Sequence, residues 1–536
     1  MREVAGLYLR LGDEIDIAVN RRVHALARAI SENRPPGITE VVPCYTCVYV
    51  EFDKRLLTAA KVSAWARNLP QEASHGSGRT VRLGVHYDGI DLGAVAAATG
   101  LDEAEVVRRH GAIEYLVYAV GFTPGFPFMG TVDPLIRLPR LTSPRPNVAA
   151  GTVAIADAQT GIYSLPSPGG WRQLGTVRET IYDPQRERPT LLEAGDSVRF
   201  EPLSSSPAED KVAHPLEPFR LLPSEPRLPR LQVHEPGLLD LVVDGGRFGA
   251  GHIGLARSGP LDALSAATAN RLVGNPADAP LLEMNAKGPV MEVLGDCLVA
   301  FGGYGVRPLV DDSAVEPFTT LALKAGAVLR FPPAGHGARG YLAIAGGIES
   351  STFMGSASVD VRGLIGKPLA AGDVLGTTTA RSGRGGFSFE PHVRWPAIER
   401  AAQKQAGRFA ALLPSDLSAT LLRLLPGPQF EAAAMKALTS RQFRIQRADR
   451  MGLQLDTGTG TAEQGTHSAV VPGHGIISEP NPLGAVQITP GGQPLVLLHD
   501  RGTIGGYSKP AIVHPRDLAV AGQLRTGDAV RFTLAQ

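Results

Sequence analysis

The residues best suited to chemistry in this sequence lie on glycine-rich segments in two separate regions. In the first region, the segment GFTPGFPFMG (121–130) carries Phe122 and Phe126 between glycines and prolines. The prolines constrain the backbone while the glycines allow close approach to a ligand, so the segment predicts a binding loop. The alternative is a proline-rich corner that seals one end of a β-barrel.

Two further segments of the first region, QTG (159–161) and SPGGW (167–171), could orient a ligand. Adjacent glycines leave backbone N–H groups free to bind an anion, and the Gln159 amide can both donate and accept. The alternative is that SPGGW is an ordinary turn. We predict a first pocket that includes Gln159, Thr160, Ser167, Gly169, Gly170 and Trp171.

A histidine, His110, ends the helical pattern DEAEVVRRH (102–110). An imidazole titrates near neutral pH, so His110 is a candidate general base. The alternative is a favourable interaction between a charged imidazole and the C-terminal end of the helix dipole.

The second region with chemical potential is HDRGTIGGYSKP (499–510). Positive charge beside free backbone amides can bind phosphate or carboxylate, although surface ion pairs are the alternative. The candidate residues of this segment are Asp500, Arg501, Tyr507 and Lys509. Two upstream acids are also candidates: Asp262, which is placed to cap an Ala-rich helix within 256–275, and Glu283 in LLEMNAKGP.

The pair Cys44 and Cys47 has CxxC spacing, but the segment VVPCYTCVYVEF (41–52) has the composition of a strand with buried thiols. We therefore predict no metal there. The sequence lacks a GxxxxGK(S/T) phosphate loop, a GxGxxG motif between strand and helix, and an amidase-type Gly-Ser signature. Lys436 in AMKA (434–437) resembles a biotinylation site, but its surroundings have helical composition, so no biotin is expected on this chain.

Length and composition limit the class of protein. The 536 residues predict three to five domains, and 62 glycines with 43 prolines favour many short strands. The net charge of +1, without a Lys/Arg run, argues against nucleic-acid binding. No signal peptide or membrane-length apolar run is visible, so we expect a cytoplasmic protein without a membrane interaction.

Changes in composition and hydrophobic pattern divide the chain into a small α/β domain (1–80) and a β-rich region (81–202), followed by further segments. The predicted class is mainly β with α+β parts, in which repeated β-barrel modules follow the small N-terminal domain. The later segments are a Pro-rich linker (203–230), a first β-rich domain (231–377), an irregular connector (378–415) and a second β-barrel (416–536).

An internal repeat supports the barrel prediction. GTVAI (151–155), GGW (169–171) and LEAGDSVRF (192–200) recur in the same order as GAVQI, GGY and LRTGDAVRF in the last 60 or so residues. The pattern predicts a strand, a Gly-Gly-aromatic turn and a Gly-Asp turn leading into a closing strand. We infer two related β-barrels on one chain.

Several segments together resemble a known family. PGITEVVPCYT, HYDGIDLGAVAAATGLDEAEVVRRH, GFTPGFPFMG and GTVAIADAQTGIYSLPSPGGWRQLGTV are similar to the KipI-like B subunit of bacterial 5-oxoprolinase, over residues 5–202. EPGLLDLVVDGGRFG, SGPLDALSAATANRLVGNPADAPLLE, LPGPQ, DRMGLQL and GGYSKPAIV resemble the KipA-like C subunit of the same enzyme, over about 231–536. Both are also labelled allophanate hydrolase subunits 1 and 2.

The resemblance implies cyclophilin-like barrels and ATP-dependent opening of 5-oxoproline to glutamate, together with the separate A subunit of 5-oxoprolinase. The same paired modules form the carboxyltransferase part of urea carboxylase, which acts on urea and carboxybiotin. A third branch consists of a sporulation-kinase inhibitor and its antagonist. The alternatives are therefore a carboxyltransferase module of a urea- or guanidine-type carboxylase and a non-catalytic histidine-kinase regulator.

The C-terminal half departs from the family pattern at three motifs. VVDGGR (242–247) and DRGTIGGY (500–507) each lack a usual glutamine, and the second also lacks a threonine. GSASV (355–359) lacks a usual arginine. These departures leave the substrate open.

The leading hypothesis is the BC component of a 5-oxoprolinase-like enzyme that acts on a small-molecule amide. His110, Gln159 and Asp500 are the candidates for the chemical step. ATP, with Mg, would bind at a site shared with the partner, a protein like the A subunit of 5-oxoprolinase. We further expect the two halves to pack on each other, since fusion raises their effective concentration, and a homo-oligomer is an open alternative to a monomer.

Overall fold

The computed structural model describes residues 3–70, 78–204, 216–378, 400, 402–404, 407, 411–412, 419–456 and 474–535. The architecture of the described residues is mainly β, with two closed seven-stranded barrels, two larger open sheets of six and five strands, a three-stranded sheet and two two-stranded sheets. This confirms the predicted class of repeated cyclophilin-like barrel modules behind a small α/β layer. Most of the predicted connector (378–415) and part of the predicted linker (203–230) lie outside the described residues.

The N-terminal layer is a three-stranded sheet of order β1-β3-β2, covered on one face by two helices. Helix α1 begins after Asp16, whose carboxylate accepts a hydrogen bond from the Val19 amide at 2.9 Å. The layer consists of β1 (Val4–Arg10), α1 (Ile17–Glu32), β2 (Ile38–Cys44), β3 (Cys47–Asp53) and α2 (Ala59–Arg67). Because side chains alternate along a strand, one face packs on the helices through Val41, Val48 and Val50, and the other is left for a different partner.

The prediction of a single strand over 41–52 is wrong. The chain turns at Tyr45-Thr46, and Cys44 pairs with Cys47 across the resulting hairpin. This turn lacks the Gly or Asn that usually marks a two-residue hairpin, which is why the sequence pattern did not show it. Both thiols are free and buried, as predicted.

The first barrel has the strand order β11-β4-β12-β5-β6-β9-β8. Helices α3 (Leu92–Thr99) and α4 (Glu103–Gly111) follow β4. The strands of the barrel are β4 (Thr80–His86), β5 (Glu114–Val120), β6 (Pro127–Gly130), β8 (Thr152–Ala156), β9 (Gln159–Ile162), β11 (Arg172–Val177) and β12 (Ser197–Pro202). A separate two-stranded sheet pairs β7 (Arg145–Val148) with β10 (Ser167–Gly169).

Two open sheets with a shared hydrophobic core form the next domain. The six-stranded sheet contains β13 (Leu228–Glu235), β16 (Val290–Val293), β18 (Leu309–Val310), β19 (Ser313–Ala314), β21 (Val328–Arg330) and β23 (Val374–Thr377). The five-stranded sheet contains β14 (Asp240–Val243), β15 (Leu281–Asn285), β17 (Cys297–Gly303), β20 (Thr320–Leu323) and β22 (Arg339–Ile344). Helix α6 (Ala263–Leu272) begins after Asp262, which accepts from the Ser265 amide at 3.0 Å, as predicted for a cap.

The second barrel repeats the first. In each barrel the closing strand, β12 or β32, runs parallel to the first strand, β4 or β24. The described elements are β24 (Thr420–Pro426), α8 (Ala432–Thr439), β25 (Gln442–Ala448), β26 (Gly452–Asp456), β28 (Ala485–Ile488), β29 (Pro494–Leu497), β31 (Ala511–Val513), α9 (Leu518–Gln523) and β32 (Ala529–Leu534). Strands β27 (Gly475–Pro480) and β30 (Ile504–Tyr507) pair antiparallel outside this barrel, with β28 and β29 between them in the sequence.

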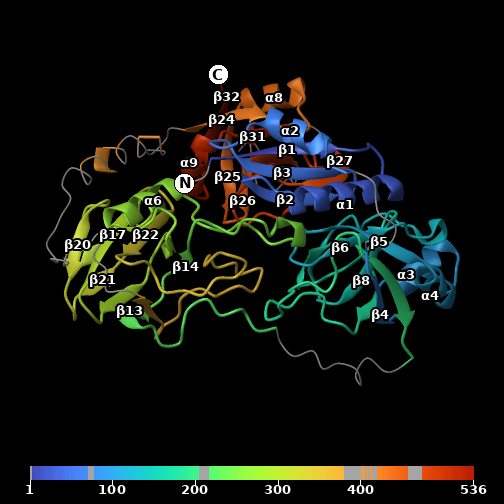
Figure 1. Cartoon of the computed structure of the whole chain (residues 1–536), viewed down its shortest axis with the longest axis horizontal. Helices are drawn as coiled ribbons and strands as arrows, with labels where there is room; N and C mark the ends of the chain where they lie inside the picture. Colours follow the sequence, from blue (N-terminus) through green and yellow to red (C-terminus); the bar gives the residue numbers. More distant parts are fainter. Residues whose placement is uncertain are drawn as a thin grey trace, which may run out of the picture.

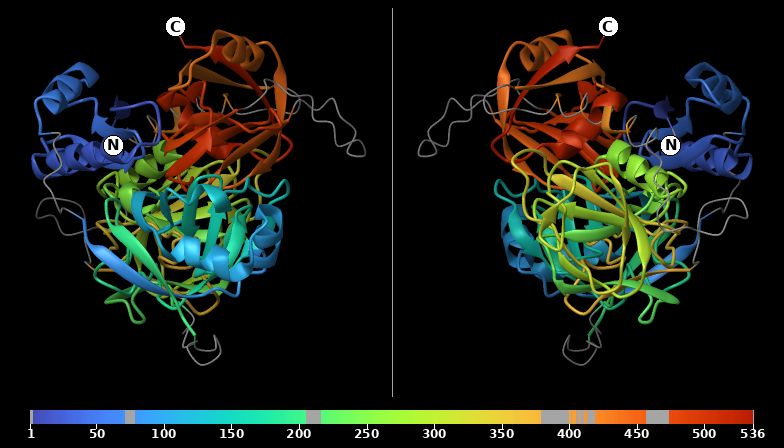
Figure 2. Two further views of the ribbon diagram at one scale, coloured as in Figure 1. Left: turned by 90° about the vertical axis from the view of Figure 1, so that its right-hand side faces the viewer. Right: turned by 90° about the vertical axis from the view of Figure 1, so that its left-hand side faces the viewer.

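The N-terminal layer lies beside the C-terminal barrel, far from it in the sequence (Figure 1). Figure 2 shows the same contact from two sides, with the first barrel and the open sheets below it. One hydrophobic cluster contains Tyr49 of the N-terminal layer, Phe126 of the first barrel and Ile504 of β30. The two halves therefore pack together. Among the described helices, none has both the length and the apolar character needed to cross a membrane.

Candidate functional site

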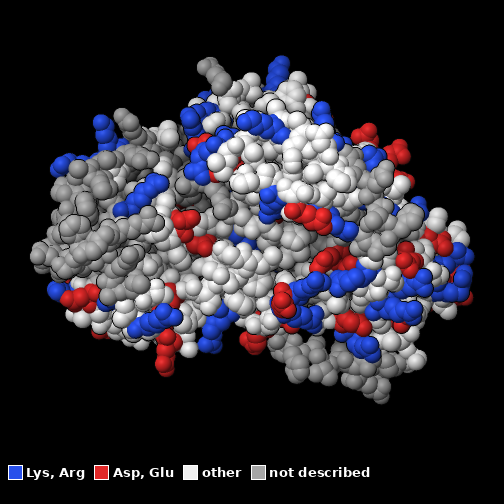
Figure 3. Space-filling model, in the orientation of Figure 1, with Lys and Arg blue, Asp and Glu red and all other residues white. Residues whose placement is uncertain are grey.

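A polar pocket lies where the N-terminal layer meets the C-terminal half. About 370 Å³ of empty space lies within it and in front of its open mouth. Its walls are the free face of β2 and β3, the segment after the short helix η2 (Gly251–Ile253), and the chain before and after β28 and β29. The lining residues are Glu40, Val42, Tyr49, Glu51, Gly251, Leu255, Ala256, Arg257, Pro480, Asn481, Arg501 and Thr503. Lysine and arginine side chains alternate with acidic ones over the face of the molecule drawn in Figure 3, so no single-sign patch on that face marks a second site.

Two carboxylates lie opposite each other on the free face of the N-terminal sheet. Glu40 of β2 pairs with Glu51 of β3 in the strand register. Glu40 accepts hydrogen bonds from the amides of Gly249 at 3.0 Å and Gly251 at 3.1 Å. Burial, followed by the charge of Glu51, raises the pKa of Glu40 to about 7.

Glu51 has a different environment, because it forms a buried ion pair with Arg257. Tyr49 also donates a hydrogen bond to Glu51 at 3.4 Å. The Arg257 guanidinium lies 4.5 Å from the centre of the Phe248 ring, a cation–π distance that holds it in place. Glu51 and Arg257 are 206 residues apart in the sequence, so this pair joins the two halves.

Arg501 forms the opposite wall. Its Nε donates to the carbonyl of Asn481 at 2.7 Å, and its Nη1 donates to the carbonyl of Leu498 at 3.4 Å. Burial, followed by the nearby charge of Arg257, lowers the pKa of Arg501. Among the described residues no acceptor is found for its Nη2, so that nitrogen can bind a ligand anion.

Buried polar atoms without a hydrogen-bond partner gather around this pocket. Within the described part of the chain they include Arg257 Nε, Ser258 Oγ, His499 Nδ1 and Thr503 Oγ1. Buried polar groups are normally paired, so a group of unpaired ones marks either an ordered water or a ligand position. Arg257 and Thr503 line the pocket directly.

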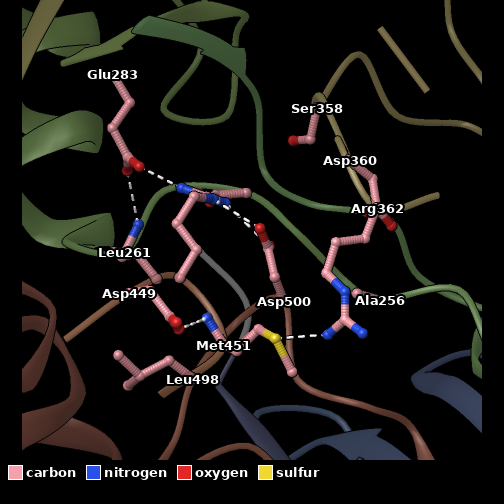
Figure 4. A network of polar contacts seen from close by, with 12 residues as sticks. Ala256, Leu261, Glu283, Ser358, Asp360, Arg362, Asp449, Met451, Leu498 and Asp500 are labelled. Carbon is pink, nitrogen blue, oxygen red and sulfur yellow. Dashed lines mark hydrogen bonds and ion pairs between the residues drawn. The ribbon is translucent and has the colours of Figure 1, made fainter. Parts of the chain in front are cut away.

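A buried arginine, Arg450, connects the segment that carries Arg257 with the segment that carries Arg501. Figure 4 shows Glu283, Leu261 and Asp500 of this polar network. Arg450 donates to Asp500 through Nε at 2.8 Å and Nη2 at 3.1 Å, and forms an ion pair with Glu283. The same Nη2 donates to the carbonyl of Gly259 at 2.7 Å, two residues after Arg257. Glu283 in turn accepts from the Leu261 amide at 2.8 Å.

Of the residues predicted in the C-terminal half, only some line the pocket. Arg501 lines the pocket, while Asp500 and Glu283 hold Arg450 behind it. Asp262 caps α6 and accepts from Gln523 at 2.8 Å, which joins α6 to the second barrel. The alternative of surface ion pairs is wrong for Asp500, because its partner Arg450 is buried.

Lys509 is fully buried and lies 3.2 Å from Glu479, which also accepts from Arg10 and Gln429, each at 2.7 Å. Tyr507, at the end of β30, is 36% exposed. Neither residue lines the pocket, although Glu479 directly precedes the lining residue Pro480.

The predicted first pocket is largely a packed aromatic cluster. The ring centre of Phe126 lies 5.7 Å from that of Trp171 and 5.7 Å from that of Phe122. Gly169 has no room for a side chain because Tyr163 lies against it, while Gly170 packs near Leu141. The loop 121–130 does approach the pocket from the other side, since the carbonyl of Phe122 lies against Gly502.

The remaining polar candidates of this region are engaged in the barrel. Gln159 accepts a hydrogen bond from Tyr45 at 2.9 Å. Thr160 is fully buried and donates to the carbonyl of Ala154 at 3.2 Å, whereas the buried Ser167 hydroxyl has no partner among the described residues. None of the three lines the pocket between the halves.

His110 lies in the interior of the first barrel. Its Nδ1 lies 2.8 Å from the Tyr87 hydroxyl and its Nε2 lies 3.0 Å from the Thr160 hydroxyl. The ring stacks on Phe200, and burial lowers its pKa to about 3. A neutral imidazole with both nitrogens engaged and no solvent access does not suit a general base, so the geometry argues against that role.

Sequence reasoning missed Glu40, Glu51, Arg257 and Asn481. One local signal was available, because a glutamate within the β-branched segments TEVV and YVEF is unusual for a strand buried on both faces. Arg257 and Asn481 carried no comparable signal. Across the described residues no group of three or more His, Cys, Asp or Glu is placed to hold a metal ion.

Comparisons with known proteins divide the chain into two parts. A family model described as "carboxyltransferase domain, subdomain A and B" matches residues 253–534, and one described as "subdomain C and D" matches residues 4–192. The chain therefore belongs to the carboxyltransferase-domain family, with both pairs of subdomains on one polypeptide. Glu40 and Glu51 lie in the C/D match, whereas Arg257, Asn481 and Arg501 lie in the A/B match.

Relatives match each half separately. The chain is 38% identical to the 5-oxoprolinase B subunit of Bacillus subtilis over 37% of this chain and 88% of the relative. It is 32% identical to the 5-oxoprolinase C subunit of Escherichia coli over 56% of this chain and 90% of that protein. The crystal structure of TTHA0988 superposes on the whole chain with a TM-score of 0.86 and 49% identity, covering 99% of this chain and 100% of that one.

Proposed function

We propose that this protein is the fused BC component of a 5-oxoprolinase-like enzyme, which opens 5-oxoproline to glutamate with ATP and a separate partner of the A type. The observation that carries the proposal is the pocket itself. Its carboxylates come from the half that resembles the B subunit, whereas its arginines come from the half that resembles the C subunit. Neither half alone supplies both sets.

The pocket suits a small cyclic amide that bears a carboxylate. Nη2 of Arg501 and the hydroxyl of Thr503 can donate to the ligand carboxylate. Glu40 and Glu51 lie on the opposite wall, where they can accept from an amide N–H. Positive charge from Arg257 is then available for an oxygen that becomes negative during the reaction.

ATP, when bound by the complex, would supply the phosphoryl group that activates the amide oxygen. The pocket is small for a whole nucleotide, and its carboxylates are engaged with Arg257 and backbone amides. We therefore assign ATP and Mg to a site shared with the partner in the cytoplasm. This chain would bind the amide and orient it for attack by water.

The test is phosphate release from ATP by the purified chain with an A-type partner, with and without 5-oxoproline. Release that requires the chain, the partner and 5-oxoproline supports the proposal. The variant Arg501→Gln should abolish this dependence, whereas Arg444→Gln, on the exposed surface of the second barrel, should retain it. Release that is indifferent to 5-oxoproline would contradict the proposal.

The family description favours one second candidate, a carboxyltransferase that receives a carboxyl group from a separate biotin carrier. The same arginines can bind a carboxylate before transfer. Transfer of labelled carboxyl from a carboxybiotin carrier protein to urea or guanidine, in the absence of 5-oxoproline, would favour this candidate.

A further inference from the structure

Glu40 and Glu51 form a pair of carboxylates with unequal surroundings. They occupy opposed positions on neighbouring strands, and both are buried, with 8% and 3% of their surface exposed. Two carboxylates this close in a buried site do not both ionise easily, because each charge disfavours the other. Pairs of acids whose environments differ are the usual basis for separate acid and base roles.

The difference between the two lies in their partners. Glu51 has a full positive charge beside it, since Arg257 forms its ion pair. Glu40 takes its hydrogen bonds from the Gly249 and Gly251 amides, and the charge of Arg257 offsets only part of the effect of its burial. Arg257 is thus engaged by Glu51, and Glu40 is left to take up or release a proton.

The charged and titratable groups that line the pocket with Glu40 fit this division. Glu51 and Tyr49 face it from β3, Arg257 from the segment after η2, and Arg501 from the loop before β30. Arg501 lies across the pocket, and the negative charge of Glu40 raises its pKa, against the larger effect of burial. His252 of η2 is exposed.

We propose that Glu40 is the proton-transferring group of this pocket, whereas Glu51 positions Arg257. This inference depends on the proposed function only for the identity of the substrate. The raised pKa of Glu40, about 7, supports this role because it allows both protonation states near neutral pH.

In the opening of a cyclic amide the proton balance is simple. Water adds its oxygen to the carbonyl carbon of the amide whose oxygen carries the phosphoryl group from ATP, the C–N bond breaks, and the departing nitrogen takes the Glu40 proton. The Glu40 carboxylate then accepts a proton from the water that has added, so Glu40 ends this step protonated, as it began. The ring-opened product is an acyl phosphate, and a second water releases phosphate from it to give glutamate.

The first test needs no activity. Infrared spectra of the full chain are taken between pH 5 and pH 9, and the spectra of Glu40→Gln are subtracted from those of the wild type. The carboxyls of Asp240, Asp262 and Asp360, whose pKa values burial also raises, are present in both proteins and cancel. The difference should contain a protonated-carboxyl band that disappears near pH 7, whereas subtraction of Glu201→Gln, which lacks an exposed carboxylate paired with Arg82, should leave no such band. Absence of the band from the wild-type minus Glu40→Gln difference, with the variant folded, would overturn the proposal.

The second test uses the complex with the A-type partner. Glu40→Gln should lower kcat for 5-oxoproline roughly 100-fold or more with little change in KM, and Glu40→Asp should restore part of it with a shifted pH profile. An unchanged kcat and pH profile in Glu40→Gln would sink the proposal. If phosphate release by the wild-type complex does not depend on 5-oxoproline, the proposed function is wrong. The infrared result then still decides whether Glu40 carries the proton.

Discussion

Arg450 and Asp500 form a buried, two-bonded ion pair, with Nε–Oδ2 at 2.8 Å and Nη2–Oδ1 at 3.1 Å. Asp500 directly precedes Arg501, and the third contact of Arg450 lies on the carbonyl of Gly259, close to Arg257. The geometry of one guanidinium therefore sets the positions of both pocket arginines. Asp500 acts through Arg450 and does not line the pocket.

Replacement of Arg450 should be strongly destabilising. In Arg450→Met the carboxylates of Glu283 and Asp500 remain buried without their cation, which typically costs about 3–5 kcal/mol. Urea denaturation should show this loss in the free energy of unfolding. The matched control is Arg447→Met, whose exposed pair with Asp449 should contribute about 0.5 kcal/mol or less. Equal effects of the two variants would contradict the role of Arg450.

Arg501→Lys should weaken ligand binding while leaving the fold intact. Lysine keeps the charge but lacks the planar fork that donates to Asn481 and to the ligand at once. We expect KM for 5-oxoproline to rise about 10-fold or more, with a smaller change in kcat, measured in the complex. Arg444→Lys on the exposed surface is the control. A pure kcat effect would show that Arg501 does not hold the substrate in its ground state.

Glu40 should make stability depend on pH in a defined direction. Its pKa is raised from 4.5 to about 7 on folding, so its contribution is fully present below pH 4.5 and is lost as the pH rises toward 7. The shift corresponds to at most about 3 kcal/mol. The free energy of unfolding of wild type minus that of Glu40→Gln, measured from pH 4.5 to pH 8, should fall across this window. A flat difference would mean that Glu40 is not perturbed.

The two halves should remain associated after proteolytic cleavage between residues 203 and 229. The cluster around Ile504 and Phe126, with the pairs Arg10–Glu479 and Glu51–Arg257, holds them together. A sizing column should show one peak containing both fragments. Ile504→Asp should separate the cleaved halves, whereas Leu421→Asp, 58% exposed on the second barrel, should not. Separation of cleaved wild type would refute this interface.

His110 should matter for stability and not for chemistry. In His110→Phe the hydroxyls of Tyr87 and Thr160 each lose a hydrogen-bond partner, which costs about 1–3 kcal/mol. The melting temperature should fall, while kcat per folded molecule and its pH profile should not change. A changed pH profile would restore His110 as a candidate general base.

Much of the fold was accessible from local patterns. The GDSVRF and GDAVRF segments predicted the closing strands β12 and β32, because a Gly-Asp turn followed by alternating apolar residues specifies a strand by itself. The cap at Asp262 was equally local, since a carboxylate three residues before a free amide suffices. The turn at Tyr45-Thr46 was missed because tertiary packing of its aromatic side chain overrides weak turn propensity.

By itself, the sequence determined the class of modules, their order along the chain and the segment that carries Arg501. Only the tertiary structure decided that the N-terminal sheet faces the C-terminal half, which places Glu51 against Arg257 across 206 residues. The physical reason is that burial and Coulomb interactions depend on distance in space. Patterns of neighbouring residues encode strands and turns, but the ionisation of Glu40 arises only when distant charges and amides surround it.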